Sequence, residues 1–289
     1  MILLIRIIQV KFWFVFLLPP RIALAIMRLA SRIIYLIARN TPIKTIVAQN
    51  IKLVMPDLPA REVADQLIKN TSLSIFEVIC IPYFKKAHYE RTFKYVGLEL
   101  LDKALAEKKG VIILTMHFGN YESTGNALAQ LGYKITNILR DDAKNPFLEI
   151  VNRSRRTGGN KLINTEADNM FTEATKALER GEIVGILIDT GALESRHEYI
   201  EFLDKKVPVA TGWLTLAQRV ACPVLSLVTV RQGNFNHIII FEQDYVRKDN
   251  RGTVIQKFSR GFEQFVRGHP EYWLMFFNEY ETKRMVEGK

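Results

Sequence analysis

From residue 99 onward, short apolar runs alternate with segments of helical periodicity. The runs are rich in β-branched and aliphatic residues, as in buried strands, and several periodic segments end at glycines. Strands are expected at residues 111–115, 133–139, 161–164, 183–188, 223–230 and 237–241, and helices at 99–108, 121–131, 145–156, 168–180, from 211 and at 253–267. This alternation predicts an α/β fold with a mainly parallel central sheet flanked by helices.

The first third of the chain has a different pattern. Residues 40–98 read as helices, with a proline-rich turn at 56–59, helical spacing over 60–84 and Pro82 near the end of that stretch. A chain of 289 residues suffices for one large domain. We therefore expect an N-terminal helical segment, 1–39, and a domain over 40–289, with a helical lead-in at 40–98 and an α/β part at 99–289.

The N-terminal segment is apolar and basic. Residues 1–56 contain eight of the 40 basic residues and none of the 30 acidic ones. The longest uncharged run before residue 39 is 12–20, well short of the ~18–20 residues that a spanning helix requires. A helix beginning at Pro20 and ending near residue 39 has its arginines spaced so that they form one stripe: Arg21, Arg28, Arg32 and Arg39.

We interpret this helix as a monotopic membrane anchor, whose apolar body enters the bilayer interface while the arginines contact anionic head groups. A tilted membrane span is the alternative, and a cleaved signal peptide fits less well because charged residues interrupt its apolar core. The uncleaved basic anchor favours the cytoplasmic face of a membrane.

Candidate chemistry lies in VIILTMHFGNYE, residues 111–122. His117, Asn120 and Glu122 follow an apolar strand at its carboxyl end, where open α/β sheets place their active sites. With Gly119 in a tight turn and Asn120 as the N-cap of the next helix, Glu122 can reach back and orient the imidazole of His117. The other ring nitrogen would then act as a base. The alternative is a histidine and a glutamate that merely satisfy buried polar groups.

Two further strands end in charged residues, Arg140 and Asp189, which should lie at the same edge of the sheet as His117. Arg140 is suited to a substrate phosphate or carbonyl oxygen, and an ion pair with a neighbouring aspartate is the alternative. Asp189 either positions the site or caps the following turn. Arg153, together with Arg155 and Arg156, either extends a basic patch for an anionic partner or lies on an exposed helix face.

Several function classes lack their characteristic motifs. The chain has no G-x-S-x-G, G-x-x-x-x-G-K-[ST] or G-x-G-x-x-G sequence, which argues against serine hydrolases, P-loop NTPases and dinucleotide enzymes. Its basic residues are not interleaved with aromatics, so nucleic acid is not an expected partner. Cys80 and Cys222 lie in apolar sequence and read as reduced core residues, and no Cys/His cluster has metal-ligand spacing. We expect neither a metal nor a bound cofactor.

The segment His117–Glu122 resembles the H-x4-D/E signature of the bacterial lipid A biosynthesis acyltransferase family. The similarity covers nearly the whole chain, through the blocks at 48–51, 55–58, 140–159, 201–203, 211–217 and 223–224. It implies a glycerol-phosphate acyltransferase-like fold, acyl carrier protein (or coenzyme A) thioester as the acyl donor, and a lipid A precursor or related glycolipid as the acceptor. It also implies attachment to the cytoplasmic face of the bacterial inner membrane.

For the site, the resemblance implies that His117 is the general base, oriented by Glu122. We expect contacts with substrate from Arg140, Asn120, Arg153 and Asp189. The chain departs from the family pattern at two places: Asp189 precedes Thr190 where the family commonly has Gln, and residues 273–278 replace a Trp-x-x-His-x-Arg pattern. A different acceptor, such as a phospholipid, aminolipid or other cell-envelope lipid, therefore stays open, as does a non-catalytic membrane-bound scaffold.

Overall fold

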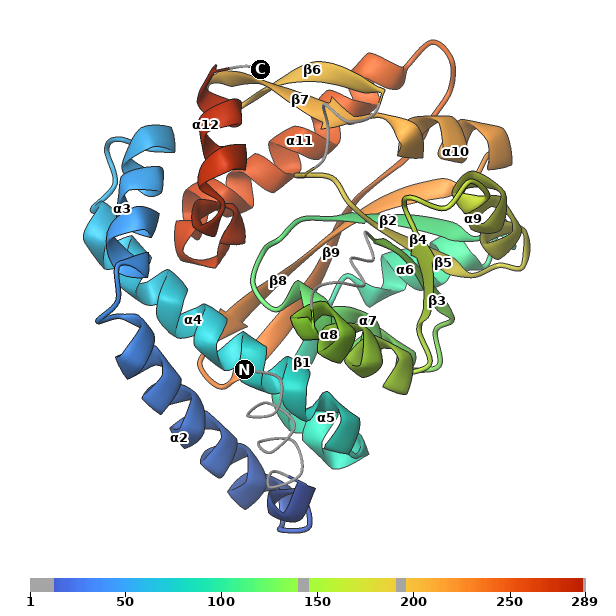
Figure 1. Ribbon diagram of the computed structural model, residues 1–289. Coiled ribbons are helices and arrows are strands. Elements are labelled where there is room, and N and C mark those ends of the chain that lie inside the picture. Colours follow the sequence, from blue (N-terminus) through green and yellow to red (C-terminus); the bar gives the residue numbers. More distant parts are fainter. Residues whose placement is uncertain (1–12, 140–145, 191–195, 288–289) are drawn as a thin grey trace.

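The chain forms a seven-stranded sheet and a separate two-stranded hairpin in the computed structural model, which describes residues 13–139, 146–190 and 196–287 (Figure 1). The order across the sheet is β1-β9-β8-β2-β5-β3-β4, and every neighbouring pair is parallel except β8 and β9. The mainly parallel α/β fold is therefore confirmed. The strands are β1 (Phe93–Val96), β2 (Val111–Thr115), β3 (Ile135–Leu139), β4 (Lys161–Asn164), β5 (Ile183–Leu187), β8 (Pro223–Gln232) and β9 (Phe235–Tyr245), with β6 (His197–Phe202) and β7 (Lys205–Ala210) in the hairpin.

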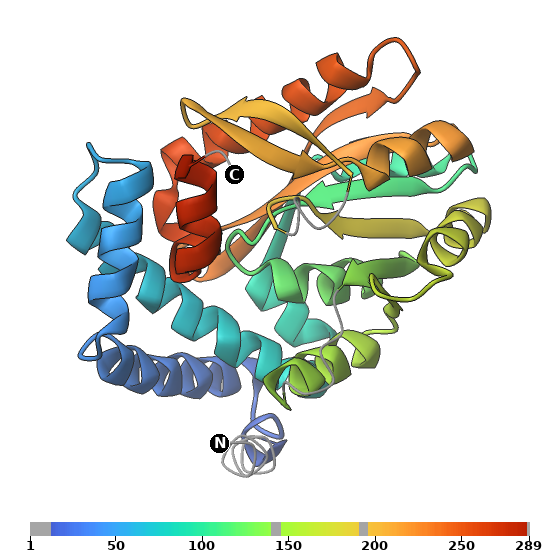
Figure 2. The same cartoon turned by 45° about the horizontal axis from the view of Figure 1, so that its top comes forward.

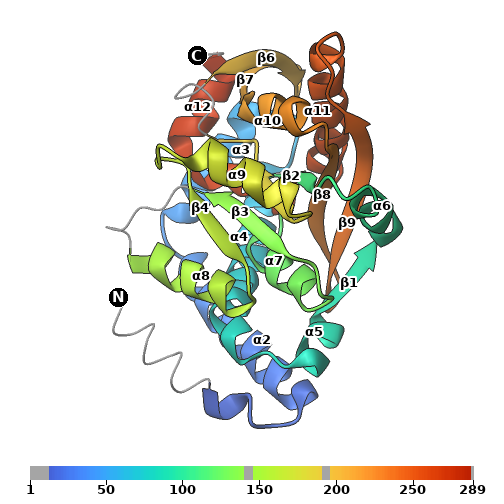
Figure 3. The ribbon, with the colours of Figure 1, turned by 90° about the vertical axis from the view of Figure 1, so that its right-hand side faces the viewer.

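Helices cover both faces of the sheet, as the alternation predicted. In Figure 3, β3 and β4 lie between α9 on one side and α7 with α8 on the other. The described helices of this part are α6 (Leu98–Leu105), α7 (Tyr121–Ala129), α8 (Pro146–Thr157), α9 (Met170–Glu179), α10 (Gly212–Val220), α11 (Arg251–Gly268) and α12 (Glu279–Glu287), with 3₁₀ turns η3 (Pro270–Tyr272) and η4 (Leu274–Phe277) between the last two. The helices before them are α2 (Pro20–Ala38), α3 (Ile43–Val54), α4 (Ala60–Cys80) and α5 (Lys86–Thr92), with the 3₁₀ turn η1 (Ile81–Tyr83) before α5.

Strand β2 lies at the centre of the sheet and is buried on both faces. Ile112 and Leu114 pack into the hydrophobic core on one face, and Val111 and Ile113 into the core on the other. This alternation follows from the two-residue period of a strand, and burial of each side chain contributes about 1.5–3 kcal/mol. The residues that follow the carboxyl end of β2 are therefore attached to a strand whose position is fixed by packing on both faces.

Helices α2, α3 and α4 form a layer at one end of the molecule, seen at the left of Figure 2. Ala23, Leu24 and Met27 pack α2 against Phe76 and Cys80 of α4. Within the described residues, no helix is both long and apolar enough to cross a membrane.

Exposed apolar side chains are concentrated in the first described part of the chain. Of the 17 exposed large apolar side chains in the described part of the chain, 13 lie between Trp13 and Leu53. We call these 13 the apolar N-terminal surface: Trp13, Phe14, Leu17, Leu18, Ile22, Leu29, Ile33, Ile34, Leu36, Ile37, Ile43, Ile46 and Leu53. Exposed apolar side chains in this number within one part of the chain are typical of a contact with another molecule or with lipid.

The arginine stripe does not face outward along its whole length, which corrects the sequence prediction. Arg28 donates a hydrogen bond to the carbonyl of Asn234 at 3.0 Å, and Arg39 lies 3.5 Å from a carboxylate oxygen of Asp65. Arg21 and Arg32 are exposed. The reason is helical geometry: Arg28 stands four residues after the buried Leu24, and therefore on the side of α2 that packs against the protein.

Strand β1, the β6–β7 hairpin and helix α12 were not expected from the sequence. Strand β1 lies within the lead-in predicted to be helical, and the β6–β7 hairpin occupies the loop expected after Asp189. The hairpin turn uses Leu203 and Asp204 at φ +51° and +59°. Tight hairpin turns of this conformation usually contain Gly or Asn, so the sequence carried no turn signal here.

Candidate active site

The turn between β2 and α7 has the geometry that the sequence predicted. Asn120 caps α7, because its side-chain oxygen accepts a hydrogen bond from the backbone N–H of Ser123 at 3.3 Å. Gly119 has φ +61°, and a Cβ there would lie 1.8 Å from the carbonyl oxygen of Thr229. Only glycine fits this position, and it lets the chain turn sharply enough to place His117 at the edge of the sheet.

The side chain that holds His117 is Asp189. Oδ1 of Asp189 lies 2.8 Å from Nδ1 of His117, and Oδ2 accepts the backbone N–H of His117 at 3.0 Å. Sheet register explains the contact: Thr115 of β2 pairs with Leu187 of β5, and each functional residue follows two positions later. The prediction that both lie at the same edge is confirmed.

Asp189 is itself fixed by a third donor. The indole N–H of Trp273 donates to Oδ2 at 3.2 Å, and the aspartate side chain is only 7% exposed. The His117 side chain is 27% exposed, and its Nε2 has no hydrogen-bond partner among the described residues. One ring nitrogen is therefore anchored, while the other is free to exchange a proton with a substrate.

The electrostatic surroundings of His117 favour its protonated form. Burial lowers the pKa of the imidazole, but the charge and hydrogen bond of Asp189 raise it, with a further contribution from Glu122, and the net shift is upward. The guanidinium of Arg155 opposes this shift. The neighbouring carboxylates therefore stabilise the positive charge that the imidazole acquires on accepting a proton.

Glu122 does not orient the imidazole, so that prediction is wrong for this geometry. Both carboxylate oxygens of Glu122 instead accept hydrogen bonds from Arg155 of α8, from Nε at 2.8 Å and from a terminal nitrogen at 2.7 Å. The two side chains are 17% and 12% exposed. Since α7 begins at Tyr121, Glu122 lies on the first helical turn and its side chain reaches α8. It acts on His117 only as a charge at longer range.

Tyr121 forms one wall beside the histidine. Its ring meets the imidazole edge-on, with 4.9 Å between ring centroids. Burial, reinforced by the Glu122 carboxylate, raises the pKa of the Tyr121 phenol well above its ordinary value, so this group stays neutral. Tyr121 was not predicted from the sequence to be part of this site, and Arg155 was predicted only as part of a basic patch or an exposed helix face.

The other predicted substrate contacts have different outcomes. Asn120 is 2% exposed, and its amide donates to Glu77 at 2.6 Å, so the structure does not place it toward a substrate. Arg153 lies exposed on α8, two residues before the arginine that reaches Glu122. Arg140 lies outside the described residues.

The segment after α11 forms backbone hydrogen bonds with the turn that carries His117. Leu274 N–H donates to the carbonyl oxygen of His117 at 2.8 Å, and Gly119 N–H donates to that of Tyr272, also at 2.8 Å. We call residues 116–120, between β2 and α7, the His117 loop. The turns η3 and η4 therefore hold the backbone of this loop, while Trp273 between them holds the side chain of Asp189.

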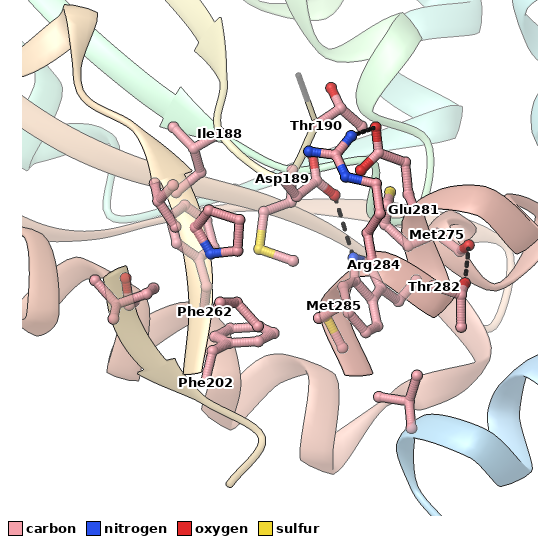
Figure 4. A pocket seen from close by; sticks show the side chains of 18 of the residues that line it. Ile188, Asp189, Thr190, Phe202, Phe262, Met275, Glu281, Thr282, Arg284 and Met285 are labelled. Carbon is pink, nitrogen blue, oxygen red and sulfur yellow. Dashed lines mark hydrogen bonds and ion pairs between the residues drawn. The ribbon is translucent and has the colours of Figure 1, made fainter. Parts of the chain in front are cut away.

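An apolar pocket adjoins Asp189, with a cavity volume of about 70 Å³. In Figure 4, Phe202, Phe262 and Met285 lie on one side of it, whereas Asp189 and Thr190 lie on the other. The β6–β7 hairpin, α11, α12 and the 3₁₀ turns supply most of its lining. A narrow apolar space beside a histidine–carboxylate pair suits an unbranched hydrocarbon chain better than a polar group. In the described part of the chain, no cluster of three or more His, Cys, Asp or Glu side chains is arranged to hold a metal ion.

Comparison with known proteins identifies the group to which this geometry belongs. No curated protein matches the chain. The profile described as bacterial lipid A biosynthesis acyltransferase matches residues 3–282, nearly the whole length, and includes His117, Glu122 and Asp189. The chain is therefore a member of the bacterial lipid A biosynthesis acyltransferase family.

Proposed function

We propose that this protein transfers a fatty acyl chain from an acyl carrier protein thioester to a hydroxyl of a lipid A precursor or a related glycolipid. The observation that carries the proposal is the His117–Asp189 pair at the carboxyl ends of two parallel strands, beside an apolar pocket. Among the described residues, nothing hydrogen-bonds Nε2 of His117. Acyl-coenzyme A is the alternative donor, because its reactive thioester group is the same.

The reaction follows from the free nitrogen of His117. Nε2 takes the proton of the acceptor hydroxyl while the hydroxyl oxygen attacks the thioester carbonyl carbon. The tetrahedral intermediate then collapses, the C–S bond breaks, and the leaving thiolate recovers the proton from His117. An ester and a free thiol result. Asp189 fixes Nδ1 as the protonated nitrogen and stabilises the imidazolium between the two proton transfers.

The pocket next to Asp189 is the proposed site of the acyl chain. Each methylene that is buried in the pocket contributes about 0.8 kcal/mol to donor binding. Thr190 lines the pocket at one of the family departures, and Phe276, which stands where the family pattern has His, lines it at the other. This location favours an altered acyl chain or acceptor, such as another cell-envelope lipid, over an altered mechanism.

The apolar N-terminal surface is the proposed contact with the membrane. Its side chains enter the interface, while Arg21 and Arg32 reach anionic head groups. We assign the main membrane contact to these apolar residues and not to the four arginines together, because Arg28 and Arg39 already have protein partners. We place the protein on the cytoplasmic face of the bacterial inner membrane, where acyl carrier protein is available.

The test incubates the detergent-solubilised protein with acyl carrier protein thioesters and extracted bacterial lipids, and follows thioester loss and new lipids by mass spectrometry. His117→Ala should abolish transfer while the protein still folds, as judged by a cooperative unfolding transition. His269→Ala, which removes an exposed histidine next to Glu271, serves as the matched control and should retain activity. A catalytically silent scaffold would bind lipid without any His117-dependent product, and that result would reject the proposal.

A further inference from the structure

A carboxylate with no role in the proposed proton transfer lies fully buried behind the His117 loop. Glu77 of α4 is 0% exposed and accepts four hydrogen bonds. Arg231 of β8 donates to Oε1 at 2.9 Å and to Oε2 at 2.6 Å. Asn120 and Asn236 donate their side-chain amides to Oε2 at 2.6 Å and 2.9 Å. A buried charge with this many partners fixes the groups around it, because loss of any donor leaves part of the charge unpaired.

The network reaches the His117 loop by two routes. The first is direct, through Asn120, three residues after His117. The second runs through the backbone of Arg231, whose carbonyl oxygen accepts the hydroxyl of Tyr272 at 2.7 Å. The carbonyl of Tyr272 in turn accepts the N–H of Gly119 at 2.8 Å. Both routes from Glu77 therefore reach the end of the turn next to α7, at Gly119 and Asn120.

We propose that Glu77 is a positioning residue, which holds the His117 loop so that the imidazole meets Asp189. Its catalytic meaning rests on the proposed acyl transfer. Capping α7 requires only the side-chain oxygen of Asn120, a task that serine performs equally well. The side-chain NH2 group of Asn120 is needed only for the hydrogen bond to Glu77. Through this second contact, Asn120 both caps α7 and fixes the His117 loop to Glu77.

A purely structural role for Glu77, joining α4 to the sheet, makes a different prediction, and the two asparagines separate the alternatives. Asn120 and Asn236 are both buried, at 2% and 1% exposure, and both donate to the same oxygen. Asn120 belongs to the His117 loop, whereas Asn236 lies on β9. Glu77→Gln is the harsher variant, since it leaves Arg231 buried without a counter-charge and can unfold the chain.

The first readout needs no substrate. Protein labelled with ¹³C at the histidine rings is titrated by NMR, and His117→Asn identifies the His117 signal by its absence. Asn120→Ser keeps the helix cap but loses the contact with Glu77, so the imidazole should separate from Asp189 and the pKa of His117 should fall. Asn236→Ser should leave that pKa unchanged. The other groups facing the ring, Glu122, Arg155 and Tyr121, are the same in both variants.

An unchanged His117 titration in Asn120→Ser, or equal shifts in the two variants, would overturn the positioning role. The second readout is turnover: Asn120→Ser should lower kcat about tenfold to a hundredfold with KM within a factor of about two, because misplacement of a catalytic group affects mainly the transition state. Asn236→Ser should stay near the wild-type rate. If the pKa of His117 falls in Asn120→Ser and not in Asn236→Ser, but the wild type shows no turnover, the acyl transfer is rejected and the positioning role is supported.

Discussion

Asp189→Asn should lower kcat strongly, although the two side chains are almost equal in size. Two N–H donors, the backbone of His117 and the indole of Trp273, point at Oδ2 of Asp189. In the variant the amide oxygen should occupy that position, because only an oxygen can accept both bonds. The amide nitrogen then faces Nδ1 of His117 and donates to it. This arrangement moves the ring proton to Nε2, which can no longer accept a proton from a substrate.

The magnitude can be worked from the contact distance. With Nδ1 and Oδ1 2.8 Å apart, the charge centres of imidazolium and carboxylate are about 4 Å apart, which corresponds to about 4 kcal/mol at an effective dielectric constant near 20. Removing that stabilisation from the transition state lowers kcat about a thousandfold. Glu122→Gln is the matched control. Because Glu122 pairs with Arg155 and touches no ring nitrogen, it should cost less than about tenfold in kcat, together with some stability from the unpaired arginine.

The assay is the initial rate of thioester loss across pH. In the wild type, burial lowers the pKa of His117 but Asp189 raises it further, so the folded pKa lies above 6.5. This group therefore stabilises the fold below the unfolded pKa, and the contribution disappears as pH rises through the folded pKa. Asp189→Asn removes the main contribution that raises the pKa of His117, while burial still lowers it, so the pKa falls and the acidic limb of kcat/KM moves to lower pH. Turnover within a few-fold of wild type, or a larger loss in Glu122→Gln, would refute the assignment of Asp189.

Three further predictions concern the turn, the pocket and the surface. Gly119→Ala should lower the free energy of unfolding in urea by more than about 2 kcal/mol, because a Cβ meets a backbone oxygen at 1.8 Å. Val209→Phe narrows the pocket and should change the ratio of shorter to longer acyl products by about tenfold or more in competition assays read by mass spectrometry. Ile33→Glu with Ile37→Glu should reduce flotation with anionic liposomes, whereas Leu131→Glu, at an equally apolar but distant exposed position, should not.

The sequence predicted the location of the site because that location depends on local pattern. An apolar strand, a glycine and an asparagine cap were enough to place His117 at the carboxyl end of β2. Parallel strands end on one side of a sheet, and this rule correctly brought Asp189 to the same edge. Both inferences use short-range periodicity and the direction of strands, which a sequence encodes directly.

The identity of the residue that holds His117 depended on tertiary register. Glu122 is five positions away in sequence and Asp189 is 72, yet the paired residues Thr115 and Leu187 make Asp189 the direct neighbour. A sequence can suggest this contact only when β2 and β5 are known to be adjacent and in what register. The inward-facing part of the arginine stripe was missed for a similar reason, because the partner of α2 could not be identified from α2 alone.

The two carboxylates near His117 now have separate roles, and this changes the meaning of the family departures. Glu122 of the signature holds α8 through Arg155, whereas Asp189 holds the imidazole. In the C-terminal segment Trp273 matches the family pattern and donates to Asp189, whereas Phe276 replaces the family's His and lines the pocket. Since the histidine–aspartate contact is intact while the lining differs at Thr190 and Phe276, we expect the departures to act on what the pocket accepts. The chemistry at Nε2 is therefore expected to be that of the family, and the substrate is where this chain should differ.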